Sequence, residues 1–299
     1  HGNICRSTMA EFVMKELVRR DHLGDAYEIA SAATSREEIG NDTHWGTKEQ
    51  LELHHIPYTS RKARQMTREV AAACRGALSA GAEEVLVKDA HDSARNIDPA
   101  GLPRGTRLNR AWSGDPLSMM SGLDREKFDA VFFTGYHAWA GCPGNPLSHT
   151  MNGRNDHVTL NGQMCSEFLI NAYTAGYYGV PVALLTGDKA LCDYAKSLIP
   201  AITTVPVLEG IGGGATCIHP DEAVERIEAA AAEAVRKAGQ CQVPMPEHFH
   251  MEVDFFKHHV AYAKSFYPGA VLKNDKYVCF DSGDWYEVLR FCHFVLSDG

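Results

Sequence analysis

Apolar residues recur along the chain at two spacings, which predict helices and strands in alternation. Helical spacing predicts helices over 8–20 and 46–56, and a short apolar run predicts a strand over 27–32. A third helix over 67–82 ends at a glycine and leads into an apolar strand. From that helix onward, the alternation favours a mostly parallel sheet flanked by helices.

The same pattern continues to residue 241 and then changes. In this middle part we expect strands over 85–88, 130–134, 182–186 and 203–207. We expect helices over 165–178, 189–198 and 221–238. A Pro-rich stretch, "QVPMPEH" at 242–248, marks a subdomain boundary. Strands over 249–255 and 277–281 and helices over 257–266 and 285–296 follow it.

These elements predict an α/β fold in three parts. The first is a partial α/β fragment over 1–64. The second is an α/β domain over 65–241, with a mostly parallel sheet. The third is a smaller C-terminal α/β subdomain over 242–299.

Composition narrows the class of protein. The chain has 299 residues and a net charge of −9, which argues against nucleic-acid binding. No apolar run is long enough for a membrane span, and no signal peptide is visible. The nine cysteines include no C-x-x-C pair, so we expect reduced, mostly buried thiols in a cytoplasmic protein.

Histidines follow two of the expected strands. His91 comes after "VLVKDA" and His137 after "AVFFTGY"; His149 follows a Gly/Pro-rich loop, and Glu167 opens a helix. Ligands in open α/β sheets bind beyond the carboxyl ends of strands, and imidazole with carboxylate suits Zn²⁺. A single histidine at a strand end is more often structural, so the pattern leaves both a metal site and a structural role open.

The first residues resemble the low-molecular-weight protein tyrosine phosphatases. "HGNICRS" at 1–7 is similar to the family's phosphate-binding loop, and "SAATSREEIGNDTHWGTKEQL" at 31–51 to its second conserved block. The resemblance implies that Arg6 clamps a phosphate, Asn3 shapes the loop and Ser7 hydrogen-bonds a thiolate. The alternative for Arg6 is an ordinary residue at a helix start.

The phosphatase reaction needs a low-pKa thiolate nucleophile and a general acid. By the resemblance, the nucleophile falls one residue before His1, and Cys5 is the loop's second cysteine, misplaced for attack. The general-acid aspartate belongs to a C-terminal part of the family that does not appear here. We therefore expect a truncated, inactive phosphatase fragment over 1–64.

The rest of the chain, about residues 65–299, resembles the zinc-dependent D-aminopeptidases (DppA-like, family M55). The stretches that carry the resemblance are "EEVLVKDAH", "SMMSGLDREKFDAVFFTGYHA", "LSHTM", "SEFLINAYTAGYYGVPVALLTGD" and "EVDFFKHHVAYAKSFYPGA". The family implies an α/β domain with a second smaller domain, ring-shaped homo-oligomers, and short peptides with N-terminal D-residues as substrates.

The peptidase resemblance also implies roles for four residues. His91, His137 and Glu167 match metal ligands of a two-zinc site, and His149 matches the catalytic histidine. The family's first strand ends in Asp-x-Glu-Gly, which supplies further ligands. Here the only Asp-x-Glu, at 124–126, precedes a strand and fits a solvated turn. We therefore expect an incomplete centre that holds one zinc or none.

The two resemblances meet at "RQMT", residues 64–67. We expect a chimera in which a phosphatase fragment replaces the first strand and metal-binding turn of a peptidase; a natural two-domain fusion is the alternative. The expected function is a metal-dependent D-aminopeptidase with an incomplete metal site. A truncated phosphatase and a non-catalytic oligomeric scaffold are the alternatives.

Overall fold

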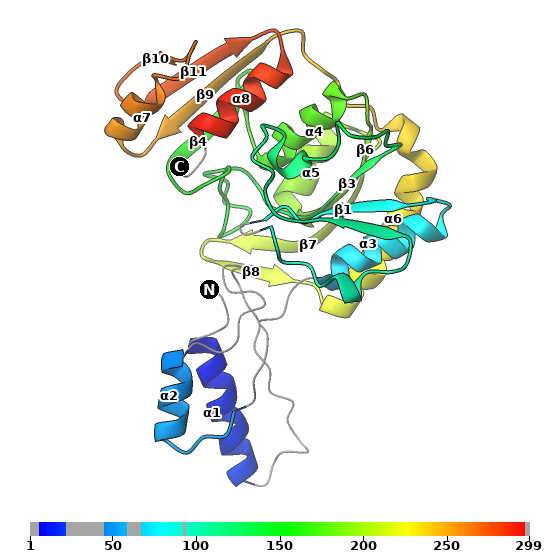
Figure 1. Ribbon diagram of the computed structural model, residues 1–299, viewed down its shortest axis with the longest axis vertical. Helices are drawn as coiled ribbons and strands as arrows, with labels where there is room; N and C mark the ends of the chain where they lie inside the picture. The colour runs from blue at the N-terminus through cyan, green and yellow to red at the C-terminus, as the bar shows by residue number, and fades with distance from the viewer. Residues whose placement is uncertain (1–5, 22–44, 59–66, 92–93, 297–299) are drawn as a thin grey trace. The chain divides into compact units, whose positions relative to one another are not determined.

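The computed structural model describes residues 6–21, 45–58, 67–91 and 94–296, and the chain divides into two compact units (Figure 1). The first unit comprises the residues up to Arg68 together with Asp89–Gly101. The second comprises Glu69–Lys88 and Leu102–Gly299.

The described residues of the first unit form two α-helices, α1 (Arg6–Arg20) and α2 (Trp45–Leu53). Phe12 of α1 and Leu51 of α2 are buried, and the Phe12 ring meets the Tyr58 ring edge-on at 6.1 Å. Both helices were predicted, but α1 begins at Arg6. The helix expected over 8–20 therefore begins two residues earlier than predicted.

A short segment of the first unit follows strand β1 of the other unit. Asp89 is buried and accepts the backbone N–H of Ile97 at 2.7 Å, which closes the turn after β1. A 3₁₀ turn, η1 (Pro99–Gly101), ends this segment. Asn3 and the strand expected over 27–32 lie outside the described residues.

The second unit is built around a four-stranded sheet of order β3-β6-β7-β8. Its strands are β3 (Val131–Tyr136), β6 (Val182–Asp188), β7 (Thr203–Ile211) and β8 (Gly214–Cys217). The first three pair in parallel, and β8 returns antiparallel to β7. All seven residues of β6 are buried, as expected of a central parallel strand.

Helices cover this sheet. They are α3 (Thr67–Ser79), α4 (Glu167–Tyr177), α5 (Lys189–Leu198) and α6 (Pro220–Lys237). Gly76 lets α3 approach α6 closely, because a Cβ there would lie 2.2 Å from the Glu228 carbonyl oxygen. The expected α/β class and the strands and helices of this part are confirmed.

Two further strands, β1 (Val85–Lys88) and β2 (Thr106–Asn109), form a separate parallel pair. The expected strand over 85–88 is confirmed, whereas β2 was not predicted. The two short helical turns of the unit are η2 (Ser118–Met120) and η3 (Ala238–Gln240).

The C-terminal part forms an antiparallel sheet of order β10-β11-β9-β4-β5. Its strands are β4 (Asn155–Leu160), β5 (Gln163–Met164), β9 (Phe249–Phe255), β10 (Val271–Leu272) and β11 (Tyr277–Ser282). The strands and helices predicted after residue 248 are confirmed. However, the sheet also takes in β4 and β5, which come from residues 155–164 and were not predicted.

Helices α7 (His258–Lys264) and α8 (Trp285–Val295) belong to this part. Trp285 is buried; its ring lies 4.9 Å from that of Phe249, and its indole N–H donates to the Thr174 hydroxyl of α4 at 3.1 Å. This contact joins the antiparallel sheet to the helical layer of the parallel sheet.

The cysteines of the described residues behave as expected. None forms a disulfide, and all are buried except Cys217. Burial raises the pKa of the Cys192 thiol to about 12, so that thiol stays protonated at neutral pH. None of the helices within the described ranges has the length and apolar character needed to cross a membrane.

Candidate metal centre

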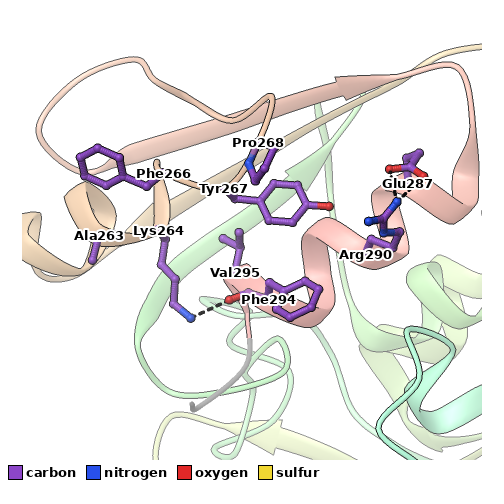
Figure 2. A pocket seen from close by; sticks show the side chains of 9 residues that line it. All are labelled: Ala263, Lys264, Phe266, Tyr267, Pro268, Glu287, Arg290, Phe294 and Val295. Carbon is purple, nitrogen blue, oxygen red and sulfur yellow. Dashed lines mark hydrogen bonds and ion pairs between the residues drawn. The ribbon is translucent and has the colours of Figure 1, made fainter.

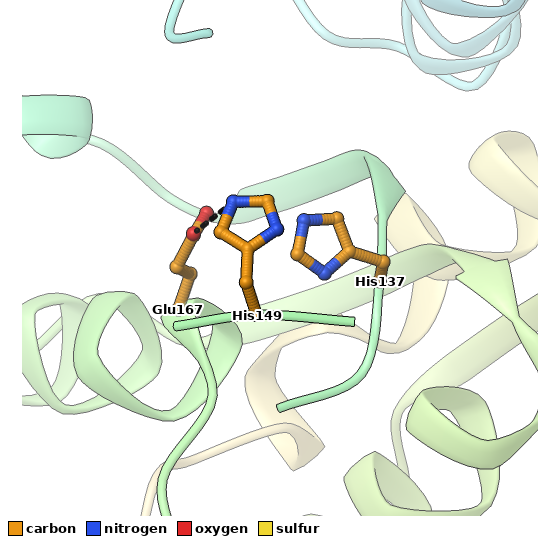
Figure 3. A group of neighbouring side chains, drawn as sticks. All are labelled: His137, His149 and Glu167. Carbon is orange, nitrogen blue, oxygen red and sulfur yellow. Dashed lines mark ion pairs between the residues drawn. The ribbon is translucent and has the colours of Figure 1, made fainter. Parts of the chain in front are cut away.

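Three side chains that the sequence singled out converge beyond the end of β3: His137, His149 and Glu167 (Figure 3). Each offers one ligand atom, and these atoms all lie within 4.8 Å of one another. The two imidazole centroids are 4.4 Å apart, and His149 Nε2 lies 3.6 Å from Glu167 Oε1. The three residues come from a strand end, the loop that follows it and the first turn of α4.

His137 is presented by an irregular strand end. The register of β3 against β6 shifts between Phe133 and Tyr136, and Gly135 within that shift has φ 72°. The Gly135 N–H donates to the Thr186 hydroxyl at 3.0 Å rather than to a ladder carbonyl. Such a bulge turns the following side chains out of the regular alternation, which directs His137 beyond the sheet.

A buried carboxylate anchors the chain just after His137. Asp188, at the end of β6, accepts the N–H of Ala138 at 2.6 Å and the Asn145 amide at 3.2 Å. Its other oxygen accepts the N–H of Leu191 at 2.8 Å and so caps α5. Sequence reasoning missed this residue, although an aspartate between an apolar strand and a helix is a typical N-cap signal.

Glu167 and His149 are held together by the chain around α4. Ser166 caps α4 by accepting the Leu169 N–H at 3.2 Å. The Met151 N–H donates to Glu167 Oε1 at 2.9 Å. The loop that carries His149 is therefore tied to the first turn of the helix that carries Glu167.

A buried hydroxyl adds a second tie. Thr150 is fully buried; its hydroxyl donates to the Cys165 carbonyl at 2.8 Å and accepts the Ala140 N–H at 3.1 Å. Thr150 directly follows His149. It therefore connects the loop that carries His149 to the segment after His137 and to Cys165, the residue before the N-cap of α4.

The hydrogen bonds of the two histidines determine their tautomers. His137 Nδ1 lies 2.9 Å from the Ala138 carbonyl oxygen, and His149 Nδ1 lies 2.8 Å from the Leu147 carbonyl oxygen. A carbonyl only accepts, so each Nδ1 carries hydrogen and each neutral ring keeps a lone pair on Nε2. His137 Nε2 and the Glu167 carboxylate are donors that fit zinc, whose histidine ligands commonly donate their other N–H to a carbonyl. The Nε2 lone pair of His149 lies beside them.

Tyr136 borders the centre. Burial of the phenol, and secondarily the charge of Glu167, raises the pKa of Tyr136, so its hydroxyl stays protonated. The Asn171 amide donates to that hydroxyl oxygen at 2.9 Å. These contacts connect β3 with α4 beside the three candidate ligands.

The other predicted site residues lie elsewhere or stay untested. His91 lies three residues after the end of β1, is exposed and belongs to the first unit; its carbonyl accepts the Asn96 amide at 2.6 Å. Its role as a metal ligand stays a prediction. Arg6 and Ser7 lie in the first turn of α1, and their phosphate-binding roles stay predictions, as does that of Asn3.

The lone Asp-x-Glu lies in a turn before β3, as expected. Both carboxylate oxygens of Glu126 accept from Arg107 Nη2 at 2.8 Å, and Asp124 pairs with Arg125 at 3.5 Å. These carboxylates are therefore engaged in exposed ion pairs.

A separate pocket of about 640 Å³ lies in the C-terminal part between α7 and α8 (Figure 2). Phe266, Tyr267 and Phe294 line it, and an ion pair between Glu287 and Arg290 borders it at 2.9 Å. None of the three candidate ligands lines this pocket, and it offers no group of histidines and carboxylates for a metal.

Comparison with family models gives two overlapping matches. The model of Peptidase_M55, D-aminopeptidase, matches residues 46–294. The model of the low molecular weight phosphotyrosine protein phosphatase family matches residues 1–76. The stretch that the two matches share contains "RQMT", where the two sequence resemblances meet.

Individual proteins match in the same way. A D-aminopeptidase of Bacillus subtilis is 33% identical over 212 residues, covering 70% of this chain and 76% of that protein. The low molecular weight phosphotyrosine protein phosphatase of Homo sapiens is 43% identical over 68 residues, 23% of this chain. The chain spans only 42% of the length of that phosphatase.

One solved structure resembles the fold closely. It is described as the Zn-dependent D-aminopeptidase DppA from Bacillus subtilis, a self-compartmentalizing protease. The TM-score is 0.69 at 30% sequence identity, and the match covers 76% of this chain and 82% of that chain. The resemblance therefore extends from the sequence to the fold.

Proposed function

Because this chain belongs to the D-aminopeptidase family, we propose that it is a zinc-dependent aminopeptidase that releases N-terminal D-residues from short peptides. The observation that carries the proposal is the convergence of His137, His149 and Glu167 beyond the end of β3. The similarity to a Zn-dependent D-aminopeptidase of known structure supports the choice of metal and substrate.

His137 and Glu167 are the proposed zinc ligands, through Nε2 and the carboxylate. When bound, zinc lowers the pKa of a coordinated water and polarises the carbonyl of the scissile peptide. The carbonyl contact of His137 and the Met151 N–H on Glu167 fix the orientation of both ligands before any metal arrives.

His149 is the proposed general base and acid. Its Nδ1–H is held by the Leu147 carbonyl, which leaves Nε2 beside Glu167 to accept a proton from the attacking water. The same nitrogen then returns the proton to the departing amine. The exposure of about one-third of the His149 side chain allows a substrate to reach it.

We propose one zinc at this centre rather than two. The chain has no Asp-x-Glu at a strand end, and its lone Asp-x-Glu is engaged by Arg107 and Arg125. We also propose a homo-oligomer, since a self-compartmentalizing relative shares the fold. Sedimentation of the purified chain tests the assembly.

The test of function uses the full chain reconstituted with Zn²⁺ and two dipeptides that differ only in the configuration of the N-terminal residue. We expect release of the D-residue, measured by chiral chromatography, to require zinc. His149→Gln should lower kcat by roughly 10²–10⁴-fold and keep the zinc. Glu167→Gln should lose the zinc, and His258→Gln, an exposed histidine of α7, should change neither.

Absence of turnover in a zinc-loaded chain would contradict the proposal and favour a non-catalytic oligomeric scaffold. Loss of zinc from His149→Gln would instead make His149 a ligand and remove its proposed role in proton transfer.

A further inference from the structure

A second group of metal-binding side chains lies in the antiparallel sheet. Asp156 and His157 of β4 and Asp254 of β9 each offer one ligand atom, and these atoms lie within 4.8 Å of one another. The group shares no residue with the centre beyond β3.

The strand register explains why neighbouring residues of β4 meet one residue of β9. Asn155 pairs with Phe255 and His157 pairs with Asp254, so Asp156 is an extra residue on β4. This is a β-bulge, in which two residues of one strand oppose one residue of the other. Two consecutive side chains, which would point to opposite faces of a regular strand, can therefore approach the same partner.

The distances within the group are long for hydrogen bonds. His157 Nδ1 lies 3.5 Å from Asp156 Oδ2 and 3.7 Å from Asp254 Oδ2. Good N–H···O bonds are shorter than about 3.2 Å. Ligand atoms bound tetrahedrally to zinc at about 2.0–2.2 Å are separated by roughly 3.3–3.6 Å, which is close to the spacing observed.

The burial of Asp254 independently favours a cation at this group. The residue is only 8% exposed, and its Oδ1 is buried without any hydrogen-bond partner. Within the described part of the chain, no lysine or arginine forms an ion pair with Asp156 or Asp254. The Tyr277 hydroxyl and His157 lie near this carboxylate, but one buried oxygen has no partner, which is costly and favours a bound cation.

Tyr277 holds the histidine from the other side. It lies opposite Asp254 on β11, and its hydroxyl is 3.3 Å from His157 Nε2. If Nε2–H donates to the phenol oxygen, the lone pair of Nδ1 faces the two carboxylates. Three acceptor atoms then face one another, and a metal ion between them stabilises this arrangement, as a proton on Nδ1 also would.

We propose that Asp156, His157 and Asp254 form a second divalent-metal site, separate from the centre beyond β3. One imidazole nitrogen and two carboxylate oxygens suit Zn²⁺ or a similar transition-metal ion. The site joins β4, which precedes α4 in the chain, to the centre of the C-terminal sheet. A metal ion bound at this site stabilises the pairing of β4 with β9. The proposal of this site does not depend on the proposed peptidase activity.

The test starts from a full-length variant that lacks the first centre, His137→Gln/His149→Gln/Glu167→Gln. We expect this variant to bind about one Co²⁺ per chain with the visible absorption of a low-coordinate site, and Zn²⁺ to displace it. Adding His157→Gln or Asp254→Asn should weaken Co²⁺ binding at least about tenfold. Adding Asp193→Asn, an exposed aspartate of α5, should leave binding unchanged.

Far-UV circular dichroism checks that each variant is folded. If the triple variant does not fold, metal content is measured on His157→Gln made in the otherwise unchanged chain. It should hold one ion fewer than the parent chain and keep any D-aminopeptidase activity. Absence of binding by the folded triple variant, or unchanged metal content in His157→Gln, would overturn the proposal.

Discussion

At the scale of single residues, both candidate metal-binding groups depend on side chains that are oriented by neighbours. The rings of His137 and His149 are fixed through Nδ1 by carbonyl oxygens, and His157 contacts the Tyr277 hydroxyl through Nε2. Such contacts select the ring nitrogen that faces a metal and reduce the entropy lost on binding.

Substitution of Asp188 should show most clearly that neighbouring groups hold His137 in position. In Asp188→Asn, an NH₂ group would replace an oxygen that accepts the Ala138 N–H or the Leu191 N–H. A buried donor facing a donor costs about 1–3 kcal/mol, so we expect that decrease in the free energy of unfolding. Displacement of the chain after His137 should also weaken zinc binding by about 10–100-fold, measured by calorimetric titration.

Asp193→Asn is the matched control for this variant, because Asp193 is exposed and pairs only with Lys189 in the same helix. It should change stability by less than about 1 kcal/mol. Equal effects of the two substitutions would show that Asp188 does not hold the segment after His137 in place.

At the scale of elements, the candidate metal centre is built where two parallel strands end together. The end of β3 carries the bulge before His137, and β6 ends in Gly187 and Asp188. Tyr136 pairs with Gly187 in the register, so the approach of the two backbones sets the position of His137.

Gly187→Ala tests this approach. A Cβ at residue 187 would lie 1.9 Å from the Tyr136 carbonyl oxygen, so β3 and β6 must separate at this end. We expect a loss of roughly 1–3 kcal/mol in the free energy of unfolding, measured by urea denaturation, together with weaker zinc binding.

The control is Gly239→Ala in η3, where a Cβ would meet nothing within 4 Å. Its stability should stay within about 0.5 kcal/mol of the parent chain. Parent-like stability and zinc affinity in Gly187→Ala would mean that the strand ends tolerate separation and do not determine the position of His137.

At the scale of the whole molecule, each of the two units buries apolar residues of its own. Phe12 and Leu51 are buried in the first, and the large core of the second unit includes Phe168, Leu184 and Trp285. Both candidate metal-binding groups found among the described residues belong to the second unit, one beyond the parallel sheet and one in the antiparallel sheet. Ions bound there should stabilise that unit by mass action.

Removal of metal should therefore loosen the second unit. A chelator should increase hydrogen exchange in peptides from β3, β4 and β9, and added Zn²⁺ should reverse the change. At a free zinc concentration of about 100 times Kd, binding adds about 2.7 kcal/mol to the stability of the folded state. Peptides from α1, which carries none of the grouped ligands, serve as the internal reference, and equal exchange with and without zinc would contradict the prediction.

Local sequence patterns were sufficient to predict most of the helices and strands. Uninterrupted apolar runs such as "VALLT" mark buried parallel strands, and the helices of the second unit show helical spacing of apolar residues. The pattern was insufficient for β4, because "NDHVTL" contains three polar residues in a row at its start. Those polar residues form the bulge and include two of the three members of the second candidate metal-binding group.

By itself the sequence determined the fold class, the family and the identity of His137, His149 and Glu167 as candidate site residues. These follow from residue types and spacings that act along the chain. Only the tertiary structure decided that these three side chains meet and that Asp188 anchors the segment after His137. It also decided that β4 pairs with the strands of the C-terminal sheet. Contacts between residues far apart in the chain depend on strand register and close packing, which no local pattern specifies.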